Sequence, residues 1–280
     1  MKKSVVFNRV VLHCFFFFLL ACEMAGGSEF YAILVGDTSE KTIKNLVKSD
    51  IKRMKKELRQ IVTYTGQNLY LAVLQGDHLN LENLQGVFET LKPRSDDTVL
   101  FYQSSHGFRT PEHEGKWPIL FFSAHNLGIH FESINQLLLN KKPRLLISLV
   151  NACNSPLPET FIHREPSISL VNRAKSNRNE FKEVYSKLFV ESKGAIIASS
   201  SKSGQQSFGL DAEGSFFTSA FLSALKRALL GEIKADWNGI MKDTVMQTVK
   251  RLKIYHYTQR PQFMILDDFQ TDFETDLQPK

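Results

Sequence analysis

The stretch LLISLVNACNS occupies residues 145–155, and a second stretch, VLFYQSSHG, occupies residues 99–107. Each begins as a short, continuous apolar run, which is typical of a strand buried on both faces of a parallel sheet. Each also carries one reactive side chain just beyond the carboxyl end of its predicted strand, namely Cys153 and His106. Functional residues of parallel sheets gather at these strand ends. If the two strands are neighbours, Cys153 and His106 face each other.

Strand patterns and helix patterns alternate along the rest of the chain. Further apolar runs lie at residues 30–36, 68–74, 118–122, 194–199 and 262–266. Between them, apolar residues recur at helical spacing over residues 47–61, 81–91, 131–138, 217–228 and 241–252, the last as Met241, Val245, Val249 and Leu252. This alternation predicts an α/β fold with a mostly parallel, doubly wound sheet.

A cysteine beside a histidine is the pair that thiol-based nucleophilic catalysis needs. The thiolate attacks a carbonyl carbon, the imidazole transfers protons, and backbone N–H groups stabilise the oxyanion. Gly107 has no side chain to block its N–H, and the N–H of Cys153 is a second candidate donor. Taken alone, a buried cysteine is more often a packing residue than a nucleophile.

Composition leaves few other classes open. The chain has 280 residues, a formal charge of +6 and three cysteines, Cys14, Cys22 and Cys153. The charge is small and scattered, so we expect no nucleic-acid partner. His113, His125, His130 and His163 have no cysteine or carboxylate at metal-ligand spacing, so we expect neither a metal site nor a cofactor.

The order of these motifs resembles that of the caspase-like cysteine peptidases, which include caspases, metacaspases, paracaspases and, more distantly, legumains. Ser-Ser-His-Gly ends at Gly107 and Asn-Ala-Cys-Asn-Ser ends at Ser155, with 47 positions from His106 to Cys153. That spacing is close to the caspase spacing of about 50 residues. The opening strand, the helix that contains Asp50, the strand at 194–199, the stretch at 205–220 and the Arg-Pro-Gln-Phe at 260–263 follow in the family's order.

The resemblance implies a three-layer α/β/α sandwich, with a mostly parallel sheet of about six strands flanked by helices, that hydrolyses peptide bonds in protein or peptide substrates. It implies Cys153 as the nucleophile, His106 as the proton carrier, and Gly107 with Cys153 as the oxyanion hole. Substrate-pocket candidates are Asn151, Ser199, Ser200 and Gln205. Family members that cleave after Arg or Lys carry Asp two positions before the cysteine. Here that position is Asn151, so the side-chain preference at the cleaved bond stays open.

The N-terminus predicts export. Lys2 and Lys3 precede an apolar run at residues 10–21, the pattern of a signal peptide. Leu19-Leu20-Ala21-Cys22 resembles the bacterial lipobox, which implies lipidation of Cys22 and a membrane anchor without a span. Cleavage near residues 25–27, which would release the protein, is the alternative. We expect a location at the bacterial cell envelope, on its periplasmic or outer-membrane face.

These patterns divide the chain into a signal peptide (1–21), a lipobox cysteine with a short tether (22–28), a peptidase domain (29–266) and an acidic tail (267–280). Residues 154–182 are polar and contain three prolines, which predicts an exposed loop that follows the nucleophile. It is a candidate for self-cleavage or a simple surface loop. Two functions remain open: a cysteine endopeptidase, or a catalytically silent domain that binds peptides. The oligomeric state stays open as well.

Overall fold

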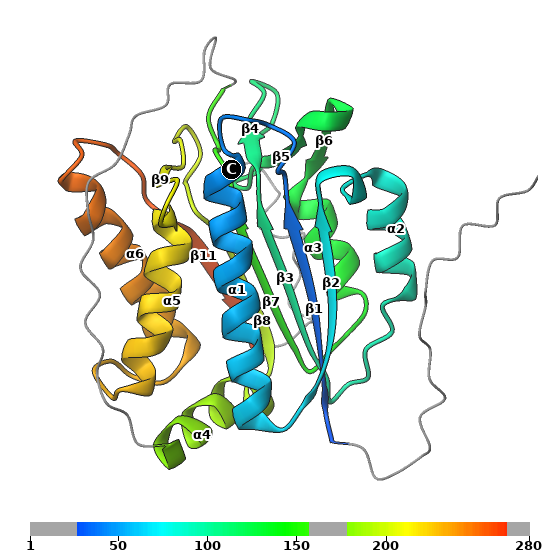
Figure 1. Cartoon of the computed structure of the whole chain (residues 1–280), viewed down its shortest axis with the longest axis vertical. Coiled ribbons are helices and arrows are strands. Elements are labelled where there is room, and N and C mark those ends of the chain that lie inside the picture. Colours follow the sequence, from blue (N-terminus) through cyan, green and yellow to red (C-terminus); the bar gives the residue numbers. More distant parts are fainter. Residues whose placement is uncertain (1–26, 157–177, 268–280) are drawn as a thin grey trace, which may run out of the picture.

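A six-stranded sheet lies at the centre of the molecule in the computed structural model, which describes residues 27–156 and 178–267 (Figure 1). The strand order is β11-β8-β7-β3-β1-β2. All neighbours are parallel except β11, which runs antiparallel to β8. The bounds are Glu29–Gly36 (β1), Asn68–Gln75 (β2), Thr98–Ser104 (β3), Leu145–Asn151 (β7), Gly194–Ser199 (β8) and Gln262–Leu266 (β11). The predicted fold class is confirmed.

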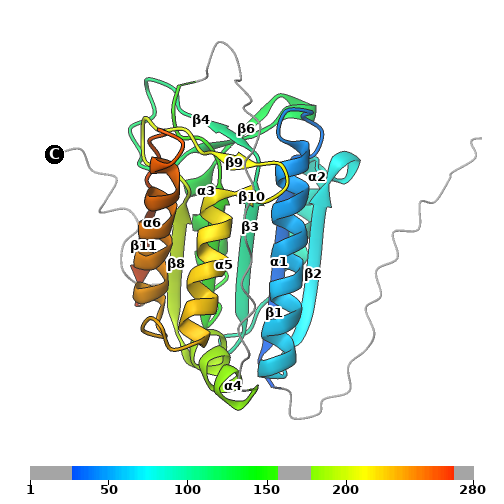
Figure 2. The ribbon, with the colours of Figure 1, turned by 60° about the vertical axis from the view of Figure 1, so that its left-hand side comes forward.

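Helices cover both faces of the sheet and complete three layers (Figure 2). Helices α1 (Lys44–Thr65), α4 (Arg178–Ser186), α5 (Phe216–Leu229) and α6 (Trp237–Lys253) lie on one face. Helices α2 (Leu81–Thr90) and α3 (Phe131–Leu139) lie on the other face. Successive strand residues point to opposite faces. Leu100 and Tyr102 therefore join the first core, and Val99 and Phe101 join the second.

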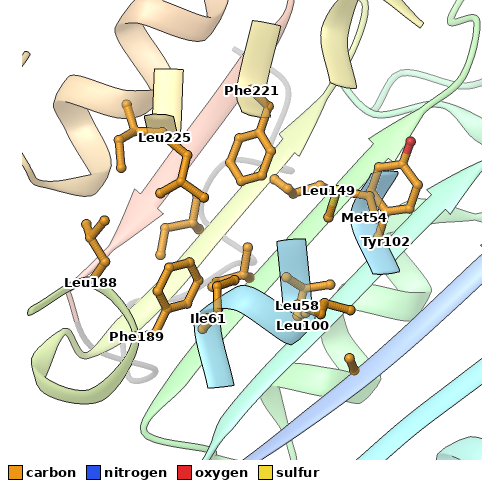
Figure 3. Packing of buried hydrophobic residues seen from close by; sticks show 14 of the residues in the cluster. Met54, Leu58, Ile61, Leu100, Tyr102, Leu149, Leu188, Phe189, Phe221 and Leu225 are labelled. Carbon is orange, nitrogen blue, oxygen red and sulfur yellow. The ribbon is translucent and has the colours of Figure 1, made fainter. Parts of the chain in front are cut away.

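Helix α1 shows how the apolar pattern becomes a packed layer. The residues at the predicted spacing, including Met54, Leu58 and Ile61, are all buried. They pack with Leu100 and Leu149 of the sheet, as Figure 3 shows. The helix ends at Gly66, whose φ of 76° is the left-handed conformation that glycine adopts without strain.

The buried face of helix α6 differs from the face that the apolar pattern predicted. Val245 and Val249 are only half-buried, whereas Thr244 and Thr248 are fully buried. Their hydroxyls donate to the carbonyls of Ile240 and Thr244, so neither buried oxygen lacks a partner. The prediction missed this face because threonine counts as polar in an apolar pattern.

Small elements surround the carboxyl edge of the sheet. β4 (His106–Phe108), β5 (Ile119–Phe122) and β6 (Leu127–His130) form an antiparallel sheet, and β9 (Gly209–Leu210) pairs with β10 (Gly214–Ser215). Short 3₁₀-helices occupy Gly76–His78 and Ser123–His125, and a π-helical turn, Lys187–Glu191, extends α4. The predicted strand at 118–122 is thus β5, in the smaller sheet.

Several predicted segments fall outside the described residues. These are the signal peptide, Cys22 and most of its tether, the middle of the 154–182 loop and nearly all of the acidic tail. The prediction that all of residues 154–182 form an exposed loop is wrong at both ends. Asn154 is fully buried, and helix α4 begins at Arg178. Among the described residues, no helix has both the length and the apolar character needed to cross a membrane.

Candidate active site

The ends of β3 and β7 bring His106 and Cys153 to one edge of the sheet. The two strands are parallel neighbours, with Ser104 opposite Asn151. The pairing continues beyond the sheet, because Ser105 N donates to Asn151 O (3.2 Å) and Arg109 N donates to Ser155 O (3.0 Å). The segment that carries His106 therefore runs beside the segment that carries Cys153. The sequence predicted this juxtaposition from the neighbouring strands.

Gly107 allows the two segments to approach closely. A Cβ atom at this position would lie 2.5 Å from Cys153 O and 2.7 Å from Ala152 Cβ, well inside van der Waals contact. Any side chain would push β4 away from the turn that holds the thiol. The packing of the site therefore requires glycine at position 107, independently of any role of its N–H group as a hydrogen-bond donor.

The Cys153 thiol lies against the backbone of Ser207. Ser207 N donates to Sγ at 3.3 Å, and Sγ lies 3.8 Å from Ser207 O, within range for the weak S–H donor. Burial raises the pKa of the Cys153 thiol, and the Ser207 N–H only partly offsets this effect. The thiol is therefore protonated at neutral pH and needs a base before it can attack.

Gln259 holds the Ser207 segment in place, and the sequence did not reveal it. This fully buried residue bridges the segment to β8: its Nε2 donates to Ser200 O (2.9 Å) and Ser207 Oγ (3.2 Å), and its Oε1 accepts from Phe208 N (2.9 Å). Ser207 Oγ in turn donates to Asn151 Oδ1 at 2.8 Å. Gln259 is a positioning residue, found only through contacts more than 50 residues away in sequence.

The four predicted pocket residues take different places. Ser199 and Ser200 have no exposed surface, and Ser200 Oγ bonds the backbone of Ala152, directly before the nucleophile. Ser200 therefore supports the nucleophile turn, whereas Ser199 Oγ bonds Ser201 O and Gln262 Nε2 instead. Gln205 is half-buried and pairs with Asn154 through its backbone. Asn151 lies at the end of β7 with its side chain toward Ser207 and Asp50.

Asp50, on α1, brings a buried carboxyl group behind Asn151. Its oxygens accept from Ser215 N (2.9 Å) and Ser104 Oγ (3.0 Å), and Asn151 Nδ2 lies 3.5 Å away. Desolvation raises the pKa of Asp50 to about 6, although these hydrogen bonds act in the opposite direction. Asp50 thus places a carboxyl group close to Asn151, the position where family members that cleave after Arg or Lys carry Asp. The Asp50 side chain, however, has no exposed surface.

The raised pKa of Asp50 predicts a pH-dependent cost to stability. Between pH 4 and 6 the folded chain keeps a proton on Asp50 that the unfolded chain has released, so the free energy of unfolding falls as pH rises. The total is about 3 kcal/mol. Asp50→Asn removes this titration. In urea unfolding, its stability relative to the natural chain should rise by most of that amount from pH 4 to pH 7.

The matched control for this measurement is Asp77→Asn, at an exposed aspartate. Its unfolding free energies should follow those of the natural chain at every pH. A constant offset between Asp50→Asn and the natural chain from pH 4 to pH 7 would contradict the prediction.

Glu40 adds negative charge near His106. The pKa of Glu40 is lowered mainly by a hydrogen bond from the Thr42 backbone, and its electrostatic interaction with His106 acts in the same direction. Glu40 follows β1, the strand beside β3, which explains how it reaches the same edge.

One group of side chains has the composition of a metal-ligand set, which the spacing of these residues in the sequence did not indicate. Of the described residues, His113, His130 and Glu132 place one ligand atom each within 4.8 Å of one another. They come from the segment after β4, the end of β6 and the first turn of α3. The wide gap between His113 and Glu132 concealed the group in the sequence.

Comparisons with known proteins found a family model that covers most of the chain and a similar solved structure. A family model described as "Caspase domain" matches residues 30–269. The crystal structure of caspase-1 from Spodoptera frugiperda is similar, with a TM-score of 0.49 and 15% identity, over 85% of this chain and 87% of that one. No curated protein matches the chain.

Proposed function

Because this chain belongs to the caspase domain family, a family of cysteine peptidases, we propose that it hydrolyses peptide bonds in protein substrates, with Cys153 as nucleophile and His106 as proton carrier. The observation that carries the proposal is the close packing of Gly107 on Ala152 and Cys153. That packing holds the histidine segment against the thiol segment at the strand ends.

The proposed reaction begins with proton transfer from Cys153 Sγ to His106. The thiolate attacks the substrate carbonyl carbon, and the N–H groups of Gly107 and Cys153 donate to the oxyanion that forms. The C–N bond then breaks, His106 gives its proton to the leaving amine, and a thioester remains on Cys153. Water, deprotonated by His106, attacks the thioester and releases the acid, which restores the thiol.

The raised thiol pKa fits this sequence of steps. A protonated resting thiol resists oxidation and metal capture, and it becomes nucleophilic only when the imidazole accepts its proton. The negative charge of Glu40 stabilises the imidazolium that results. The buried network of Gln259 and Ser207 keeps Sγ aimed at the site.

Substrate preference is the part of the proposal that the residues leave open. Asn151 stands where relatives specific for basic residues carry Asp, and the carboxyl group of Asp50 lies behind it without exposed surface. A buried cationic side chain needs a directly paired charge. We therefore propose a pocket with polar rather than acidic walls.

A peptide library tests the function and the preference together. We expect the purified chain to cleave a subset of sequences, with a common residue before the cut, and Cys153→Ala to cleave none. If the natural chain cleaves none of the library, the catalytic proposal is wrong. The chain would then be a silent peptide-binding domain, the second reading of the sequence.

We further propose that Cys22 carries a lipid that anchors the protein at the bacterial cell envelope, as the Leu-Leu-Ala-Cys motif indicates. In a bacterial host, Cys22→Ala should abolish incorporation of labelled palmitate and move the protein from the membrane to the soluble fraction. Hydrophobic acyl chains supply the membrane affinity that this variant loses.

Cys14→Ala is the matched control, because Cys14 lies in the apolar run and outside the lipobox motif. It should keep both the label and the membrane location. Equal labelling of the natural chain and Cys22→Ala would refute the anchor.

A further inference from the structure

The group formed by His113, His130 and Glu132 lies beside the nucleophile segment but outside it. His113 belongs to the segment 109–117, which joins β4 to β5, while His130 ends β6 and Glu132 lies in the first turn of α3. The rings of His113 and His130 are 4.8 Å apart, centre to centre, and His113 Nε2 is 3.7 Å from Glu132 Oε1. Three donors of metal-binding type therefore converge from three separate elements.

Of the three side chains, Glu132 is the one whose position and burial best suit it to bind a cation. Its Oε1 accepts from Trp117 N at 3.3 Å, which fixes the group in place. Its Oε2 is buried, and no hydrogen bond to it is made by any residue in 27–156 or 178–267. A buried carboxylate oxygen without such a partner is costly. The positive charge of Arg109 acts on Glu132, but it does not supply the missing contact to Oε2, which a bound cation would supply.

His113 is oriented for ligation by its own backbone neighbourhood. His113 Nε2 lies 2.8 Å from Trp117 O, so this nitrogen donates to the carbonyl and Nδ1 is left as the ligand atom. Metal-bound histidines commonly have their ring position set by such a carbonyl. His130 is exposed, so it can rotate toward an arriving ion and leave room for a water molecule.

We propose that His113, His130 and Glu132 bind a Zn²⁺ ion, with water as the fourth ligand. Two imidazoles and one carboxylate form a common zinc ligand set. In a tetrahedral site with bonds of 2.0–2.1 Å, ligand atoms lie about 3.3–3.4 Å apart. The three atoms here lie within 4.8 Å of one another, so we expect side-chain rotations alone to close the site.

The ion would fasten the segment 109–117 to the start of α3. Arg109 links this segment to the nucleophile turn, through Nε to Asn154 Oδ1 (3.2 Å) and through its guanidinium to the carbonyls of His113 and Gly115. Asn154 Nδ2 also donates to Lys116 O at 2.8 Å. The zinc ion therefore stabilises a segment that packs directly against Asn154, the residue after Cys153.

The test uses Zn²⁺ alone and untagged protein in a Cys153→Ala background, so that the thiol cannot bind the ion. Competition with a chromophoric chelator should give one site per chain, and zinc should raise the melting temperature through its binding to the folded state. His130→Gln and Glu132→Gln should each weaken binding by about 100-fold or more and remove the thermal shift. His130 is exposed, so its variant is expected to fold.

His78→Gln, at an exposed histidine elsewhere, is the matched control and should bind zinc normally. The proposal is overturned if the background protein binds no zinc, if binding survives in both ligand variants, or if the control loses it equally. Every readout is independent of peptide cleavage, so a failure here leaves the proposed peptidase untouched, and the reverse also holds.

Discussion

Replacing Cys153 with alanine is expected to lower kcat for peptide cleavage by at least about 10⁴-fold, the scale on which loss of a nucleophile acts. No covalent thioester can form without Sγ, and Cys153 is the one cysteine among residues 27–156 and 178–267. Cleavage of the best library peptide is the measurement.

Cys153→Ser is the matched variant for this prediction. It keeps the shape of the side chain and the hydrogen bond from Ser207 N, so its melting temperature should stay close to that of the natural chain. Its activity should nevertheless fall steeply, because a hydroxyl is far harder to deprotonate than a thiol. Substantial cleavage by Cys153→Ala would show that the nucleophile lies elsewhere.

His106→Ala is expected to lower kcat/KM by about 10²–10⁴-fold, the usual contribution of a positioned acid–base group. It should also slow the alkylation of Cys153 by iodoacetamide near neutral pH. Burial holds the thiol in its protonated form, and the variant has no imidazole to accept the proton.

The pH profile separates this role from a merely structural one. As pH rises toward the raised pKa of the thiol, alkylation of His106→Ala should recover, since hydroxide then replaces the imidazole as base. His78→Ala, at an exposed position, should alkylate at the rate of the natural chain throughout. Equal rates for His106→Ala and the natural chain near pH 7 would remove His106 from the mechanism.

The fold could be predicted because its signals are local. The run at 145–151 and the spacing of Met54, Leu58 and Ile61 depend only on nearby residues, and their burial follows from the period of a strand or helix. In helix α6 the apolar pattern did not predict the burial of Thr244 and Thr248. Their hydroxyls bond carbonyls one turn earlier, so polar residues are buried where an apolar pattern expects valine.

The candidate site could be predicted only in part, because only some of its residues are marked by local sequence signals. His106 and Cys153 follow neighbouring strands, and parallel strands of one sheet end at the same edge, so the pairing needed no knowledge of side-chain contacts. Asp50 reaches the site from α1, and Gln259 reaches it from the segment before β11. No spacing in the sequence marks such residues.

By itself, the sequence determined the α/β class, the two strand ends that carry the reactive side chains, and the importance of Gly107 beside them. It could do so because hydrophobic period and strand direction are properties of short segments. Only the tertiary structure decided what surrounds the thiol: the Ser207 backbone against Sγ, the buried carboxyl of Asp50 behind Asn151, and the meeting of His113, His130 and Glu132. Burial and long-range contact set a group's pKa and ligands, and both arise only when the layers pack together.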